Sequence, residues 1–158
     1  MKFLKLALIF AFVAFAQWLA DTRLALWGFS PSLLYLAALA VSVSFSAPAA
    51  IVFAFLCGFY VDFLGGSLFG AHALVYTGAA YFTGLLHRRM DLGSLPTQML
   101  FCALMTAAAL LALGLVALVF AGYFLWPGFA GFSVIILLTS LLSPVLFLGT
   151  AMLHTEEK

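Results

Sequence analysis

Long runs of apolar residues, separated by short polar or turn-forming segments, divide the chain into six stretches. A helix that crosses the hydrocarbon core of a bilayer needs about 20 mostly apolar residues. The pattern therefore predicts an all-α integral membrane protein, with a single transmembrane domain over residues 1–158 that folds as a six-helix bundle. We expect the spans at approximately 3–20, 27–47, 49–64, 68–86, 96–122 and 131–153.

Prolines mark two of the expected boundaries. Ser30 and Pro31 predict the start of the second helix, because serine caps helices and proline is tolerated in the first turn. Pro48 is expected to end the same helix, after a segment rich in serine.

Composition supports the same class of protein. The chain is 67% hydrophobic and only 7% charged, whereas a soluble domain has about 25% charged residues. The protein is therefore expected to lie in a membrane. The net charge of +1 gives no indication of a nucleic-acid partner, and we expect none.

Basic residues predict the orientation. With six spans, both termini and the 87–91 connection lie on one side of the membrane, and basic residues concentrate on the cytoplasmic side. Arg23 alone lies on the other side, so we predict cytoplasmic termini. The tryptophans at positions 18, 27 and 126 all fall at the outer ends of spans, as an interfacial belt would place them. The five basic residues on the side of the termini are Lys2, Lys5, Arg88, Arg89 and Lys158.

Asp62 is the one carboxylate well inside an apolar span. An ionisable group at that depth is costly, so it is expected to point into the bundle rather than towards lipid. Gly58, Asp62, Gly66 and Gly70 follow one another at intervals of four. In a continuous helix these residues would share one face.

A turn is expected to interrupt that helix. Gly65, Gly66 and Ser67 favour a tight bend between the third and fourth helices. Asp62 then lies about one turn before the bend, and His72 lies early in the returning helix.

The chemistry of Asp62 and His72 has three interpretations. The pair could relay protons, Asp62 could bind a ligand or partner, or Asp62 could be a structural acceptor of hydrogen bonds from His72, the turn backbone or a nearby hydroxyl. We favour the structural interpretation. The chain has no other acid–base pair or metal-ligand cluster, so we predict no catalytic residue, no metal and no cofactor.

Two further segments carry polar residues. In the last span Thr139 and Ser143 share a face, and Ser143 could satisfy backbone groups that a kink at Pro144 frees. A kink without any further role is the simpler interpretation. In the 87–91 connection His87, Arg88 and Arg89 either anchor the cytoplasmic interface or form a docking site.

Residues 58–74 resemble the glycine–aspartate–glycine–serine–glycine run of the bacterial rod shape-determining protein MreD family. Pro31 is similar to the proline that opens the family's second helix, although Ser32 follows it here instead of Asp or Asn. Pro144 is similar to a late proline in the last helix. Thr139 stands where the family often has Asn.

This resemblance implies a non-enzymatic scaffold of the cell-elongation machinery in the bacterial inner membrane. Family members associate with the single-pass protein MreC, and through it with MreB filaments, the RodA glycosyltransferase and a class B penicillin-binding transpeptidase. The implied role is to help maintain rod shape by organising peptidoglycan synthesis. Membrane lipid is an additional expected partner.

The family is also similar in fold to the substrate-binding S components of energy-coupling-factor vitamin transporters, which supplies an alternative function. Ala7 and Ala11 even resemble the alanine motif by which S components dock. Against this alternative, the chain contains no Asn, and Gln occurs only at positions 17 and 98. A polar vitamin would therefore find few directional hydrogen-bonding groups. A membrane enzyme that uses Asp62 ranks third.

Overall fold

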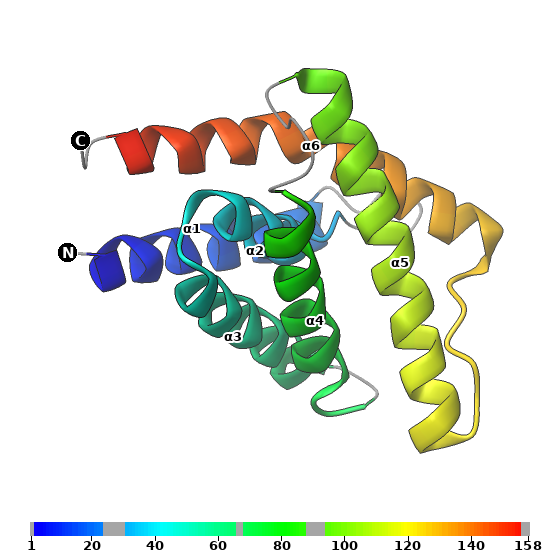
Figure 1. Cartoon of the computed structure of the whole chain (residues 1–158). Coiled ribbons are helices and arrows are strands. Elements are labelled where there is room, and N and C mark those ends of the chain that lie inside the picture. Colours follow the sequence, from blue (N-terminus) through cyan, green and yellow to red (C-terminus); the bar gives the residue numbers. More distant parts are fainter. Residues whose placement is uncertain (1, 24–30, 66–67, 88–93, 156–158) are drawn as a thin grey trace.

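The computed structural model describes residues 2–23, 31–65, 68–87 and 94–155, and these form six α-helices without any strand. Both the all-α class and the number of helices expected from the sequence are confirmed. Figure 1 shows their arrangement. The helices are α1 (Lys2–Arg23), α2 (Leu33–Ser44), α3 (Ala47–Gly65), α4 (Ala71–Leu86), α5 (Leu95–Ala121) and α6 (Gly128–Thr155).

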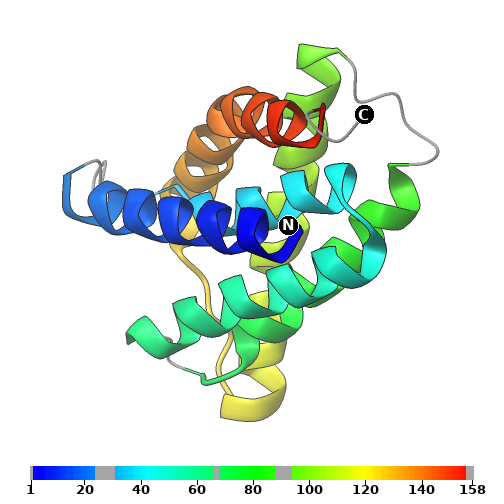
Figure 2. The ribbon, with the colours of Figure 1, turned by 90° about the vertical axis from the view of Figure 1, so that its left-hand side faces the viewer.

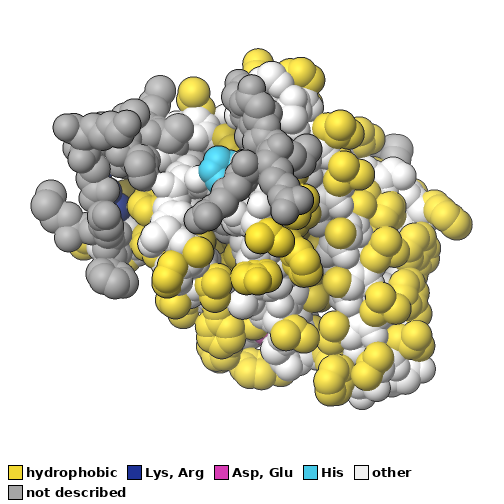
Figure 3. Space-filling view, in the orientation of Figure 1, with side chains coloured by type: hydrophobic (Ala, Val, Ile, Leu, Met, Phe, Trp, Pro, Cys, Tyr) yellow, Lys and Arg dark blue, Asp and Glu magenta, His cyan; other side chains and the backbone are white. Residues whose placement is uncertain are grey.

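Helix α2 lies in the middle of the molecule (Figures 1 and 2). It contacts α1, α3, α4 and α6, and every residue from Leu34 to Ser42 is buried. A helix that is apolar on all sides belongs inside a protein rather than at its surface. The surrounding helices instead expose many large apolar side chains, which cover much of the face seen in Figure 3.

Helices of two lengths make up the bundle. Segments of α1, α3, α5 and α6 are long and apolar enough to cross a membrane. Helices α2 and α4 have 12 and 16 residues, which gives lengths of only ~18 Å and ~24 Å at 1.5 Å per residue. The hydrocarbon core is about 30 Å thick. Because a short helix can end where no water is available, its terminal backbone groups need partners within the protein.

The second helix differs most from the sequence prediction. The structure has a helix over 33–44 instead of 27–47, and residues 24–30, which include Ser30, lie outside the described part of the chain. Pro31 is therefore not in the first turn. It precedes the helix by two residues, and Ser32 occupies the N-cap position without a side-chain capping bond.

The expected role of Pro48 was also wrong. Helix α2 ends at Ser44, and Phe45 continues in an extended conformation. Pro48 is the second residue of α3. Since the first-turn N–H groups of a helix have no intrahelical partner, a proline there removes no helical hydrogen bond.

The fourth helix begins later in the chain than the sequence predicts, because the turn that follows α3 extends to Gly70. The predicted span is 68–86, whereas α4 covers 71–86. Gly70 is its N-cap residue and has φ +93°, a left-handed conformation that glycine adopts without steric strain. The other helices differ from the predicted ranges by one to three residues at each end.

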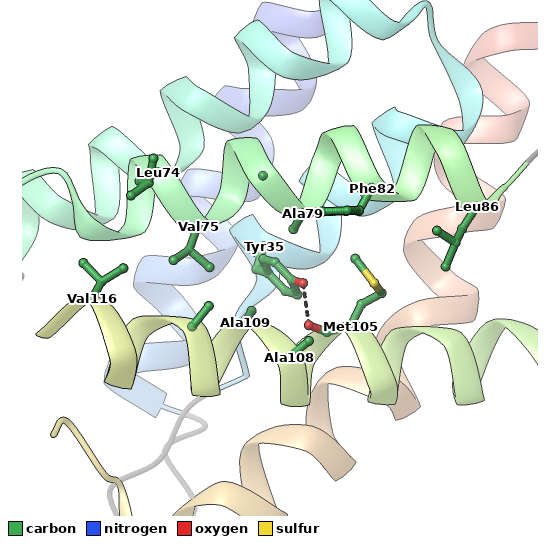
Figure 4. A pocket seen from close by; sticks show the side chains of 12 residues that line it. Tyr35, Leu74, Val75, Ala79, Phe82, Leu86, Met105, Ala108, Ala109 and Val116 are labelled. Carbon is green, nitrogen blue, oxygen red and sulfur yellow. Dashed lines mark hydrogen bonds between the residues drawn. The ribbon is translucent and has the colours of Figure 1, made fainter. Parts of the chain in front are cut away.

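One side-chain hydrogen bond joins the central helix to α5. The Tyr35 hydroxyl donates to the backbone carbonyl of Met105 at 2.7 Å, and the Tyr35 ring is 2% exposed. The contact is drawn in Figure 4. Because the hydroxyl is buried among apolar groups, this carbonyl satisfies a donor that water cannot reach.

We expect Tyr35→Phe to lower the thermal stability of the detergent-purified protein, because a net hydrogen bond contributes about 0.5–1.5 kcal/mol. The measurement is thermal unfolding followed by circular dichroism. Tyr81→Phe is the matched control, since Tyr81 is 59% exposed. Equal melting temperatures for the two variants would contradict a stabilising role for the Tyr35 bond.

Candidate functional site

Asp62 is held by three hydrogen bonds from the beginning of α4. Its Oδ1 atom accepts from the backbone N–H of His72 at 3.1 Å and lies 2.8 Å from Nδ1 of the His72 ring. Its Oδ2 atom accepts from the backbone N–H of Ala73 at 3.0 Å. The Asp62 side chain is fully buried, whereas that of His72 is 22% exposed. Because a carboxylate can only accept, Nδ1 of His72 is the nitrogen assigned the proton.

These bonds make Asp62 the cap of a neighbouring helix. Gly70 occupies the N-cap position of α4 and has no side chain with which to cap it. His72 and Ala73 are the second and third residues of α4, whose N–H groups are normally satisfied by the N-cap side chain. Asp62 supplies that acceptor from α3. A carboxylate at this position is also favoured by the helix dipole.

Gly58 allows the close approach that this capping requires. A Cβ atom at Gly58 would lie 2.5 Å from both Cα of Ala73 and the carbonyl oxygen of His72. Only a residue without a side chain fits this contact. Gly58 and Asp62 therefore meet the same end of α4 from one face of α3, one turn apart, as their spacing predicted.

The start of α2 is capped in a similar way. The backbone N–H of Leu33 donates to Oε1 of Gln17 in α1 at 2.7 Å, and Nε2 of Gln17 donates to Asp21 at 2.9 Å. The backbone N–H of Ser32 donates to Oγ1 of Thr139 in α6 at 3.4 Å. Thr139 is fully buried. Side chains of α1 and α6 thus satisfy the first backbone donors of the central helix.

Tyr76 lies between these two capped ends. Its hydroxyl is 3.4 Å from Oγ of Ser32, and its ring packs edge-on against the ring of His72, with centroids 6.0 Å apart. A cavity of about 240 Å³ next to it is lined by residues of α1 to α4, among them Gln17 and Asp21. The polar groups of four helices therefore converge at this end of the bundle.

The last helix contains the proline that the sequence indicated. Pro144 lies inside α6, where it cannot donate to the carbonyl of Ser140. The Ser143 hydroxyl donates to that carbonyl at 2.7 Å. Ser143 thus satisfies a backbone group that Pro144 leaves free, in agreement with the sequence prediction, and α6 changes direction along its length in Figures 1 and 2.

Comparison with known proteins identifies the family. The model of the family described as rod shape-determining protein MreD matches residues 1–154 of the 158. The chain belongs to the MreD family. Comparisons with curated proteins and with solved structures gave no match.

Membership of the MreD family gives the protein a role in determining rod shape, as part of the shape-determining complex of the inner membrane. The sequence resemblance is thereby confirmed. The family is one of shape determination rather than one known for enzymatic activity.

The remaining residues singled out from the sequence are distributed over the fold. Gly65 ends α3 with φ +153°, and Gly66 and Ser67 lie outside the described residues. His87 is the C-cap residue of α4. Arg88 and Arg89 also lie outside the described residues.

The structure brings some of these residues together. Gly58, Asp62, Gly70 and His72 meet at the start of α4. Pro31 is buried directly before Ser32, and Ser32 contacts Thr139.

Sequence reasoning missed Gln17. The sequence drew attention to it only as one of two glutamines. Its spacing of four residues from Asp21 was an available signal, because residues at that spacing share one face of a helix. The pairing with Leu33 depends on how α1 crosses α2, which periodicity does not specify. Tyr35 and Tyr76 were missed because each lies within a mostly apolar run, where a tyrosine is counted as one more apolar residue.

We expect Gly58→Ala to destabilise this MreD-family protein, because the added methyl group would collide with the backbone of α4. Overpacking of this kind costs about 1–3 kcal/mol. Gly84→Ala is the control, since a Cβ atom there meets nothing within 4 Å. Both changes raise helix propensity equally, so a lower melting temperature for Gly58→Ala alone isolates the collision. A Gly58→Ala variant as stable as Gly84→Ala would contradict the close packing.

Proposed function

We propose that this member of the MreD family is a non-enzymatic inner-membrane scaffold of the cell-elongation machinery. Its direct partner is the single-pass protein MreC. MreB, RodA and a class B penicillin-binding transpeptidase associate with it through the complex that it forms with MreC. By organising peptidoglycan synthesis in this way, the protein helps to maintain rod shape. The observation that carries this proposal is the use of both Asp62 oxygens to cap α4.

The geometry of Asp62 favours a structural role over a chemical one. Both of its oxygens accept backbone hydrogen bonds, and the ring of His72 takes a further position on Oδ1. A carboxylate that served as a general base would instead face the proton it removes. Among the residues that the structure describes, no group of three or more metal-ligating side chains comes together.

The character of the cavities supports a scaffold over a vitamin-binding S component. Two cavities of about 490 and 480 Å³ are lined almost wholly by apolar residues. The polar cavity beside Tyr76 has a volume of about 240 Å³, which is below the range of roughly 300–1,000 Å³ that is typical of ligand sites. A polar, water-soluble vitamin needs several precisely placed hydrogen-bonding groups.

The arrangement of helix ends supports six crossings with cytoplasmic termini. In Figure 1 the start of α1 and the end of α6 lie on the left of the molecule, and α5 begins at the top, above the end of α4. The α3–α4 turn lies at the bottom and the α5–α6 connection at the lower right. We propose that the two termini and the α4–α5 connection face the cytoplasm. Five of the six basic residues in the sequence belong to these three segments.

Reporter fusions test this topology. A cytoplasmic fluorescent reporter should be active when it is fused after Lys158 or inserted between His87 and Asp91, and inactive after Trp126. Alkaline phosphatase, which works only in the periplasm, should show the opposite pattern at the same sites. Phosphatase activity at the C-terminus would overturn the six-span arrangement.

Substitutions of Asp62 test the scaffold role. Asp62→Leu leaves two buried N–H groups unpaired, and each lost acceptor costs about 1–3 kcal/mol. It should lower the melting temperature, reduce recovery of MreC in a pull-down and give round cells in a rod-shaped host. Asp62→Asn keeps one acceptor oxygen, so it should show a smaller loss in all three measurements.

His72→Phe is the matched control, because it removes the ring donor but keeps both backbone bonds and the aromatic packing on Tyr76. The scaffold proposal predicts rod-shaped cells for this variant, whereas a proton relay predicts failure. If Asp62→Asn and His72→Phe fold and recover MreC normally but give round cells, the chain performs chemistry and the proposal is wrong.

A further inference from the structure

The end of α5 and the connection to α6 form an apolar tip, which we define as residues 118–129. Every residue from Leu118 to Trp126 is exposed, and the α5 part of the tip reaches lowest in Figures 1 and 2. The sequence has no Ser, Thr, Asn, Gln, His or charged residue anywhere from position 107 to 132. The only polar side-chain groups of the tip are therefore the hydroxyl of Tyr123 and the indole N–H of Trp126.

The connection folds back against the helix that precedes it. A Cβ atom at Gly114 would lie 2.7 Å from two ring atoms of Phe124, so this ring covers the α5 backbone. The ring of Trp126 in turn contacts three others, with centroids 6.0, 5.5 and 5.2 Å away. These rings belong to Phe124, Phe129 and Phe132. The tip is therefore a packed unit that presents a defined aromatic surface.

The backbone of the tip requires polar surroundings. Residues 122–127 are not helical. The N–H group of Gly122 donates to the carbonyl of Leu118 at 3.2 Å, but those of residues 123–126 find no backbone acceptor in the described part of the chain. Such groups need water or another acceptor, and the hydrocarbon core of a bilayer supplies neither. The connection is therefore excluded from the middle of the membrane.

The side chains of the tip require apolar surroundings. Phe120 and Phe129 are 74% and 83% exposed, and protein surfaces in water rarely contain large apolar patches. Water would thus satisfy the backbone but not the side chains, and hydrocarbon would do the reverse. The interfacial layer of a bilayer offers both acyl chains and the oxygens of lipid headgroups. Tryptophan and tyrosine concentrate in that layer because each has an apolar ring and a polar group.

The length of α5 makes such an anchor consequential. Its 27 residues extend for about 40 Å at 1.5 Å per residue, whereas the hydrocarbon core is about 30 Å thick. A helix that is too long for the core tilts, and interfacial aromatic residues help to set the tilt. At the opposite end of α5 the exposed hydroxyl of Ser94 bonds to that of Thr97, so only the α6 end of the helix is aromatic.

We propose that the tip inserts into the interfacial layer of the lipid bilayer and anchors α5 at a fixed depth and tilt. The phenylalanine side chains enter the acyl chains. The N–H groups of residues 123–126, together with the polar groups of Tyr123 and Trp126, donate to lipid ester and phosphate oxygens and to interfacial water. Because the tip has no charged residue, it binds zwitterionic and anionic lipids alike. The proposed topology assigns the tip to the outer leaflet, but insertion itself does not depend on that topology.

Spin-label depth measurements on the full chain in phosphatidylcholine vesicles test the insertion. Both native cysteines are buried, so a label can be directed to Phe120→Cys. Leu111→Cys, in the middle of α5, and Ser94→Cys, at its polar end, are the controls for hydrocarbon and water. Collisions with oxygen report hydrocarbon, and collisions with a water-soluble nickel complex report water. The label at position 120 should lie between the two controls in depth and collide with both reagents.

Each other outcome at position 120 overturns the proposal. Nickel collisions as frequent as at position 94 would place the tip in water. A depth equal to that of position 111 would place it in the hydrocarbon core. Protection from both reagents in the purified chain would mean that a second copy of the protein covers the tip.

A double substitution tests the anchor itself. Tyr123→Phe with Trp126→Phe keeps aromatic rings but removes both polar side-chain groups, so the label at position 120 should shift deeper, towards the depth of position 111. Tyr81→Phe is the matched control on α4, where the side chain is also exposed, and it should leave the depth unchanged. An unchanged depth in the double variant would overturn the anchoring role of these two residues. Because all of these measurements use the purified chain alone, failure of MreC binding leaves their outcome unaffected.

Discussion

Pairing of backbone N–H groups at the ends of short helices is the constraint on which this fold depends. Within a bilayer no water is available to satisfy such groups. The two short helices, α2 and α4, begin with residues whose own side chains form no capping bond. Asp62 caps α4, and Gln17 and Thr139 cap α2. Each cap comes from one of the four long helices, so the caps also fix how the long helices surround the short ones.

The same arrangement explains how a charged residue is accommodated in an apolar chain. Burial of a carboxylate is costly unless hydrogen bonds compensate for the lost water. Asp62 receives two backbone donors and one ring nitrogen, and these come from a helix end whose dipole favours negative charge. Gly58 makes this possible by bringing the two backbones together. Asp62 and Gly58 together tie the third helix to the start of the fourth.

Much of the fold could be predicted from the sequence because apolar runs and turn residues are local signals. Six helices were expected and six are observed in the described residues. The largest differences from the prediction concern proline. Pro31 was expected in the first turn of the second helix, but it precedes α2. Pro48 was expected to end that helix, but it lies in the first turn of α3. Proline restricts its own conformation and removes one donor, and this is compatible with a position just before a helix or in its first turn.

The sequence by itself determined the membrane class, the number of helices, the turn before His72 and the shared face of Gly58 and Asp62, since each follows from composition or spacing within one segment. The tertiary structure alone decided that α2 lies at the centre and that Asp62 meets the backbone of α4. It also decided that Gln17 and Thr139 cap the central helix, and that the connection after α5 folds back over Gly114. These features join residues that are 10 to 107 positions apart. Their contacts depend on the angles at which helices cross, and no periodicity along a single helix encodes those angles.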